Sequence, residues 1–138
     1  MTSESNFVPS TRGQTCVAVL VLIVAGIVVY ANSLHGEFIF DDLWVVAGNE
    51  KLKTAADAWS ANRSRPVAMV TFAANVAVHG DNVVGFHLTN LAIHIVAGLL
   101  LFALVRTTLT HDPLAKRFGR HATWLALAIA LLWLVHPL

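Results

Sequence analysis

The stretch CVAVLVLIVAGIVVY, residues 16–30, is almost wholly aliphatic and carries no charged side chain. The charge-free region around it extends from Arg12 to Glu37. A helix needs roughly 20 mostly apolar residues to cross about 30 Å of hydrocarbon. We therefore predict a transmembrane helix near residues 14–33, preceded by a short tail, residues 1–13.

Two further charge-free stretches follow, one between Asp81 and Arg106 and one after Arg120. They predict transmembrane helices near residues 85–106 and 120–138. The third is only just long enough and stops where the sequence stops, so we expect the chain to be the first piece of a longer protein.

The composition agrees with a membrane protein. Of 138 residues, 57% are hydrophobic and 12% are charged, whereas about a quarter of a soluble domain is charged. The mean hydropathy is +0.68, and the single cysteine, Cys16, excludes an internal disulfide. The net charge of +1 and the scattered basic residues exclude nucleic acid as an expected partner. The predicted fold class is an all-α membrane protein with three transmembrane helices.

Basic residues predict the orientation, because Lys and Arg near span ends are retained in the cytoplasm. The loop at 107–119 and its borders carry four basic residues and one acid: Arg106, Lys116, Arg117, Arg120 and Asp112. We expect this loop and the tail to be cytoplasmic, and the long first loop, 34–84, to be periplasmic or lumenal, most simply at a bacterial inner membrane. A cleavable signal ending at Val29-Tyr30-Ala31 is the alternative for the first span, although two later spans favour an uncleaved anchor.

Two adjacent carboxylates, Asp41 and Asp42, lie between apolar groups of the outer loop. Such a pair suits a divalent cation such as Mg²⁺ or Mn²⁺, which prefers hard oxygen ligands, or a general base with its neighbour. The structural alternative is that the pair caps a short helix beginning at Leu43, since Asp is a favoured N-cap residue.

The outer loop also predicts two short helices at the membrane surface. One covers residues 54–60, and the second is opened by Arg65-Pro66 and continues through the apolar run 67–78. Arg63 and Arg65 would lie at the headgroup level, where a guanidinium binds a lipid phosphate or makes ordinary headgroup contacts.

The second span carries polar residues on one helical face: His87, Asn90 and His94, followed by Gly98. Polar side chains inside hydrocarbon turn toward a wet site or bond to neighbouring helices, and the pattern leaves both open. His136, beside Pro137, ends the third span.

Several motifs occur in an order that resembles a known family. They are Tyr30-Ala31-Asn32-Ser33-Leu34, Phe38-Ile39-Phe40-Asp41-Asp42, Asn49, Arg65-Pro66-Val67, Thr71-Phe72, Asn75, residues 85–91 (GFHLTNL), His94 and His136-Pro137-Leu138. From about residue 28 to the end, the chain resembles the transmembrane and tetratricopeptide-repeat O-mannosyltransferases and their bacterial relatives, which are GT-C glycosyltransferases.

This resemblance implies transfer of a sugar, mannose in the family, from a polyprenyl-phosphate donor to a hydroxyl of a protein or glycan acceptor on the outer face. It implies that Asp41 or Asp42 is the general base or a metal ligand. Arg65, the polar face formed by His87, Asn90 and His94, and also His136 would then lie toward the lipid phosphate or the acceptor.

The family has many more spans, so we expect these 138 residues alone to be inactive. The partners would be membrane lipids and the remainder of the same chain. The alternative is a non-catalytic three-span accessory subunit of a larger membrane complex.

Overall fold

Helix is the only regular structure in the parts that the computed structural model describes, residues 12–36, 45–46, 49–80 and 82–136. Three helical segments there are long and apolar enough to cross a membrane: Arg12–Leu34, Val83–Thr110 and Ala115–Val135. This confirms the predicted all-α membrane fold class. The chain divides into two compact units, one formed by residues 1–30 and 91–138 and the other by residues 31–90.

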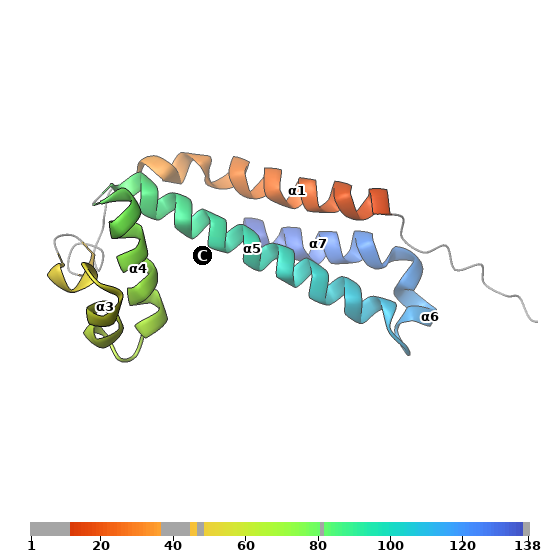
Figure 1. The fold of residues 1–138 in the computed structure, drawn as a ribbon. Helices are drawn as coiled ribbons and strands as arrows, with labels where there is room; N and C mark the ends of the chain where they lie inside the picture. The colour runs from red at the N-terminus through yellow and green to blue at the C-terminus, as the bar shows by residue number, and fades with distance from the viewer. Residues whose placement is uncertain (1–11, 37–44, 47–48, 81, 137–138) are drawn as a thin grey trace, which may run out of the picture. The chain divides into compact units, whose positions relative to one another are not determined.

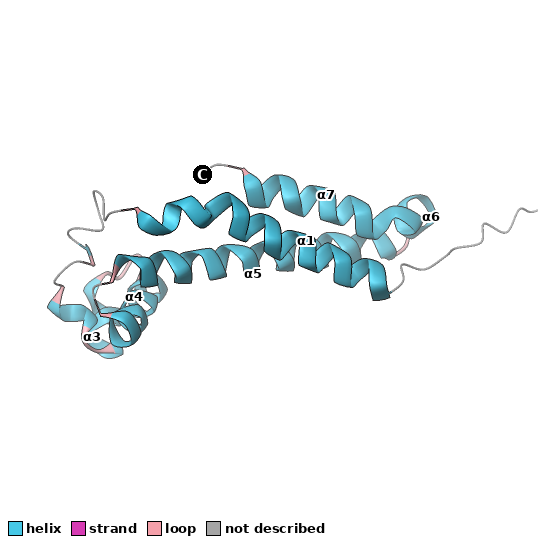
Figure 2. Cartoon of the chain, turned by 90° about the horizontal axis from the view of Figure 1, so that it is seen from above, coloured by secondary structure: helices cyan, strands magenta, loops and turns pink. Residues whose placement is uncertain are grey.

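The first unit packs three helices: α1 (Arg12–Tyr30), the later part of α5 (Val83–Thr110) and α7 (Ala122–Val135). α1 and α7 run in the same direction and α5 runs against them (Figures 1 and 2). A short helix α6 (Ala115–Phe118) and a 3-10 turn η3 (Gly119–His121) connect α5 to α7.

Small side chains let these three helices approach closely. The core consists mainly of alanine and leucine with one aromatic ring: Ala18, Leu22, Phe102, Ala126, Leu127, Ala130 and Leu134. A Cβ atom added at Gly98 would lie 3.0 Å from Leu134 Cδ1, and one added at Gly26 would lie 2.8 Å from Ile95 Cγ1. Such close backbone approach is typical of helix packing in membranes.

Most of the apolar surface of the spans is not covered by protein. Of the most apolar 18 residues in each span, only 17%, 11% and 39% are buried. Large side chains such as Leu104 and Leu132 are 65% and 72% exposed. An exposed apolar surface of this kind is suited to lipid or to further membrane helices.

The second unit contains η1 (Ala31–His35), η2 (Glu50–Leu52), α3 (Ala55–Ala61), α4 (Pro66–His79) and the first two turns of α5. The two helices predicted in the outer loop are α3 and α4. Its core is formed by buried apolar residues from these elements and from the segment before η2: Val46, Leu52, Ala58, Met69, Ala73 and Phe86.

Capping side chains set where these short helices begin. Thr54 Oγ1 accepts a hydrogen bond from the Asp57 backbone N–H at 3.1 Å and so caps α3. Pro66 occupies the first turn of α4, where its missing N–H costs nothing. The Asn82 side chain accepts a hydrogen bond from the Val84 N–H at 3.0 Å at the start of α5. This helix begins at Val83, two residues before the span predicted at residues 85–106.

Candidate functional site

The two carboxylates that carry the catalytic prediction, Asp41 and Asp42, lie outside the described residues, so their role stays a prediction. Within the described parts of the chain, no group of three His, Cys, Asp or Glu side chains is placed to hold a metal ion. The geometry of the site therefore comes from the helices that follow the acidic motif.

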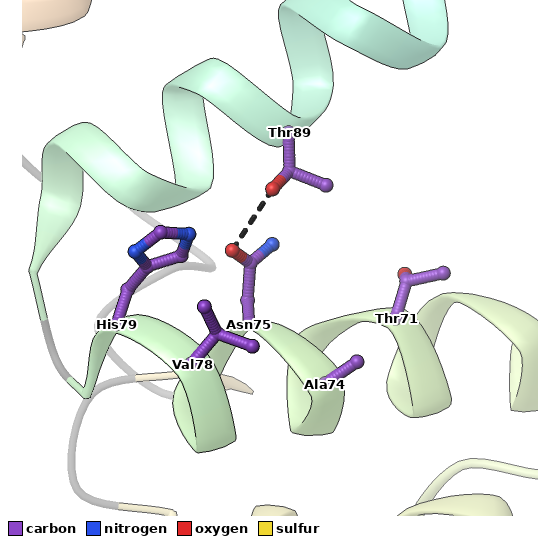
Figure 3. A pocket seen from close by; sticks show the side chains of 6 residues that line it. All are labelled: Thr71, Ala74, Asn75, Val78, His79 and Thr89. Carbon is purple, nitrogen blue, oxygen red and sulfur yellow. Dashed lines mark hydrogen bonds between the residues drawn. The ribbon is translucent and has the colours of Figure 1, made fainter.

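A cavity of about 230 Å³ lies between α4 and the start of α5 (Figure 3). Six residues line it: Thr71, Ala74, Asn75, Val78, His79 and Thr89. Thr71, Asn75, Val78 and His79 follow one another at spacings of four, three and one, so they lie on one side of α4. The cavity is lined by apolar groups together with a few hydroxyl, amide and imidazole groups.

Asn75 is the central polar group of this cavity. It is only 5% exposed, and its Oδ1 accepts a hydrogen bond from Thr89 Oγ1 at 2.9 Å (Figure 3). The amide nitrogen makes no hydrogen bond to another described residue, so its two N–H groups can donate to a bound hydroxyl or phosphate oxygen. Neither Asn75 nor Thr89 was selected from the sequence as a site residue. The available signal was that Asn75 is the one amide in the apolar run 67–78.

A second cavity of about 420 Å³ is lined by Trp59, Ser60, Arg63 and Pro66, at the junction of α3 and α4. Arg63, not Arg65, therefore lines a cavity with its neighbours. Arg65 is exposed and occupies the N-cap position of α4 without making a capping bond through its side chain. Both guanidinium groups lack a carboxylate partner among the described residues.

The predicted polar face of α5 divides between the two units. In the second unit, His87 Nε2 lies 3.2 Å from the Gly36 carbonyl oxygen, and Asn90 is exposed. His94, in the first unit, has its Nε2 2.9 Å from the Leu134 carbonyl oxygen near the end of α7. The structure thus gives both histidines backbone partners: His94 bonds to α7, whereas the partner of His87, Gly36, lies outside the helices. A role of this face toward a substrate stays a prediction.

The His94 ring is also held by aromatic side chains of the first unit. Its centroid lies 5.1 Å from that of Tyr30, edge to face, and 4.9 Å from that of Trp133 in a stacked arrangement. The Tyr30 hydroxyl donates to the His136 carbonyl oxygen at 3.3 Å, while the His136 side chain is exposed. His94 and His136 therefore lie at the same end of α7, and His136 contributes a backbone contact there.

Comparison with known proteins finds relatives among protein O-mannosyl-transferases. The chain is 29% identical to protein O-mannosyl-transferase TMTC1 of Homo sapiens, over 88% of this chain and 14% of the human protein. It is 30% identical to human TMTC4, over 99% of this chain and 21% of that protein. It is 31% identical to the protein O-mannosyl-transferase F38B6.6 of Caenorhabditis elegans, over 67% of this chain and 16% of the relative.

These relatives confirm the resemblance that the motifs indicated, since they are named protein O-mannosyl-transferases and match most of the chain. The chain spans only 14–21% of the length of the three relatives described. No model of a protein family matches the chain, and no solved structure matches it significantly.

Proposed function

We propose that this chain is part of a membrane glycosyltransferase of the GT-C type that transfers a sugar, mannose in the first instance, from a polyprenyl-phosphate donor to an acceptor hydroxyl. The observation that carries the proposal is the similarity to protein O-mannosyl-transferases over 88% and 99% of the chain. The accessory-subunit alternative has no comparable support.

The geometry of the second unit is compatible with this chemistry. A sugar presents hydroxyl groups, and the cavity around Asn75 offers amide and hydroxyl partners for them. A polyprenyl phosphate presents an anion, and Arg63 and Arg65 offer guanidinium groups free of carboxylates among the described residues. Sugar and phosphate partners are thus both available within residues 31–90.

The proposed reaction breaks the bond between the anomeric carbon and the phosphate oxygen and forms a bond to the acceptor oxygen. The acceptor hydroxyl loses its proton to Asp41 or Asp42, acting as the general base. The departing phosphate takes both electrons of the broken bond, and a cationic group such as Arg63 or Arg65 stabilises its charge. If a divalent cation takes part, the same two carboxylates are its proposed ligands.

We propose that the second unit faces the periplasm or lumen, with the start of α1 and the segment 111–121 in the cytoplasm. The basic side chains at Lys116, Arg117 and Arg120 support this orientation. Sequence analysis favoured a bacterial inner membrane, and that assignment stays a prediction; the relatives compared above are animal proteins.

The catalytic assignment is tested by Asp41→Asn and Asp42→Asn. Each substitution is made separately in the full-length protein, assayed in the membrane. The donor is a polyprenyl-phosphate mannose, and transfer is measured by product formation. A base or metal ligand requires the negative charge, so turnover should fall by roughly 10²-fold or more. Glu50→Gln is the matched control, because Glu50 is an exposed acid of the same loop.

A capping role for the pair gives the opposite result, because Asn caps a helix about as well as Asp. Near-normal transfer by both Asn variants would therefore contradict the catalytic assignment. Membrane insertion and expression should be unchanged in either case.

A further inference from the structure

A third cavity lies in the first unit, at the end where α1 begins, α5 ends and α7 begins. Its volume of about 350 Å³ is within the range of small-ligand sites, about 300–1,000 Å³. The cavity is lined by Arg12, Thr15, Cys16 and Arg106. Arg12, Thr15 and Cys16 are spaced by three and one residues, so one face of α1 supplies all three. Arg106 completes the cavity from α5.

Arg106 is held in place by α7. Its Nε donates a hydrogen bond to Thr123 Oγ1 at 3.2 Å, and Thr123 is only 2% exposed. A guanidinium has five N–H donors, so this bond restricts the orientation of the group and leaves the terminal nitrogens available. The arrangement is typical of an arginine oriented for a ligand, because a mobile side chain would lose more conformational entropy on binding.

The cavity is strongly cationic. Among the residues that the structure describes, neither Arg12 nor Arg106 pairs with a carboxylate. The basic residues of the segment joining α5 and α7, which are Lys116, Arg117 and Arg120, do not line the cavity, so its charge comes from the two arginines that do. Two guanidinium groups that line one cavity without an acid favour an anion as its ligand, and phosphate accepts paired hydrogen bonds from arginine.

The surface next to the cavity is apolar, which favours a lipid as the source of that phosphate. Val17 and Leu20 on α1 are 49% and 60% exposed, and Leu104 on α5 is 65% exposed. The cavity therefore lies where the polar helix ends meet the hydrocarbon-facing surface. Basic pockets between transmembrane helices at this level are suited to phospholipid headgroups.

We propose that Arg12 and Arg106 form a binding site for the phosphate of an anionic phospholipid, at the end of the first unit opposite to Tyr30 and His94. Arg106 binds the phosphate oxygens through its terminal nitrogens, and Arg12 supplies the second charge. The acyl chains lie along the exposed aliphatic side chains of α1 and α5. This site is separate from the transfer chemistry proposed above and does not depend on it.

The test measures binding to the full chain in neutral detergent by native mass spectrometry. The probes are dihexanoyl-phosphatidylglycerol, its zwitterionic counterpart dihexanoyl-phosphatidylcholine, and inorganic phosphate. We expect phosphatidylglycerol to bind best, and Arg12→Gln and Arg106→Gln each to weaken it by about tenfold, the effect of losing one hydrogen bond to a charged group. Arg120→Gln is the matched control, since Arg120 is an exposed arginine of the same unit that does not line the cavity.

Arg106→Lys separates a built site from general charge attraction. Lysine keeps the charge but lacks the guanidinium fork and its bond to Thr123, so binding should still weaken. Equal binding by the Arg106→Lys, Arg106→Gln and Arg120→Gln proteins would overturn the proposal. Arg12 is exposed, so Arg12→Gln keeps the test decisive even if Arg106→Gln fails to fold. Binding of inorganic phosphate as tight as that of the lipid would support the phosphate site but overturn the lipid as its source.

Discussion

His94 is the residue whose surroundings say most about its role. The last carbonyl groups of a helix have no hydrogen-bond donor within the helix. Inside a membrane, no water is present to donate a hydrogen bond to them instead. His94 Nε2 donates to one of these groups, the Leu134 carbonyl of α7, while Tyr30 and Trp133 fix the ring. We therefore assign His94 a structural role as a cap for α7, supplied from a neighbouring helix.

This role predicts the effect of two substitutions. His94→Phe keeps a ring but loses the donor, and His94→Gln keeps a donor but loses the ring. Each should lower the free energy of unfolding by about 0.5–1.5 kcal/mol, measured in mixed micelles by denaturant titration. His136→Gln is the control and should be nearly silent, because only the backbone of His136 accepts a bond. If the His94 variants are equally silent, the capping role is wrong.

The pair formed by Asn75 and Thr89 makes a different prediction, since both partners are polar. Thr89→Val removes the donor and leaves the Asn75 oxygen, in a residue only 5% exposed, without its bond. An unsatisfied buried group costs about 1–3 kcal/mol, whereas replacing both partners by apolar groups is nearly neutral.

We therefore expect Thr89→Val to lower the free energy of unfolding by more than the double variant Asn75→Leu/Thr89→Val does. A double-mutant cycle on the purified chain measures this coupling. Strictly additive effects would show that the two side chains do not depend on one another.

At the scale of elements, the turn between α4 and α5 shapes the cavity around Asn75. Gly80 has a φ of 61°, a left-handed conformation that favours glycine, and its N–H donates to the Val76 carbonyl at 2.8 Å. Five residues later, a Cβ added at Gly85 would lie 2.6 Å from both Cβ and Cγ of His79. The two helices thus meet at a contact that only a glycine permits.

Gly85→Ala tests that contact. Helix propensity alone would stabilise α5 by up to ~1 kcal/mol, but overpacking against a Cβ typically costs about 1–3 kcal/mol, so we expect a net loss of stability. Adding His79→Gly should relieve the clash, whereas adding His79→Ala should not, because alanine keeps the Cβ. Thermal unfolding followed by circular dichroism compares the three proteins; a stabilised Gly85→Ala protein would contradict the contact.

The sequence predicted the elements that local rules govern. Pro66 and Thr54 mark the starts of α4 and α3 through capping and first-turn preferences, and hydropathy marks the three long apolar helices. Contacts between distant residues were beyond such rules. The bond from Thr89 to Asn75 depends on the α4–α5 turn, and the lining of the second cavity by Arg63, not Arg65, depends on how α3 meets α4.

At the scale of the whole molecule, the uncovered aliphatic surface of the long helices implies a chain embedded in a membrane. α5 has 28 residues, a length of about 42 Å, which exceeds a hydrocarbon core of about 30 Å. A helix of this length is longer than the hydrocarbon core is thick, so α5 can cross a membrane with residues to spare.

The orientation of the whole chain is tested with single cysteines in a Cys16→Ala background. Ser60→Cys lies in α3, and His111→Cys lies just after α5; both positions are exposed, and neither change alters the Lys and Arg count. Positive residues stay in the cytoplasm. An impermeant thiol reagent added to the outside of the intact membrane should therefore label only the cysteine at position 60. After the membrane is permeabilised, both should react. Labelling of position 111 alone in unbroken membranes would reverse the orientation, and it would place the proposed transfer site on the cytoplasmic side.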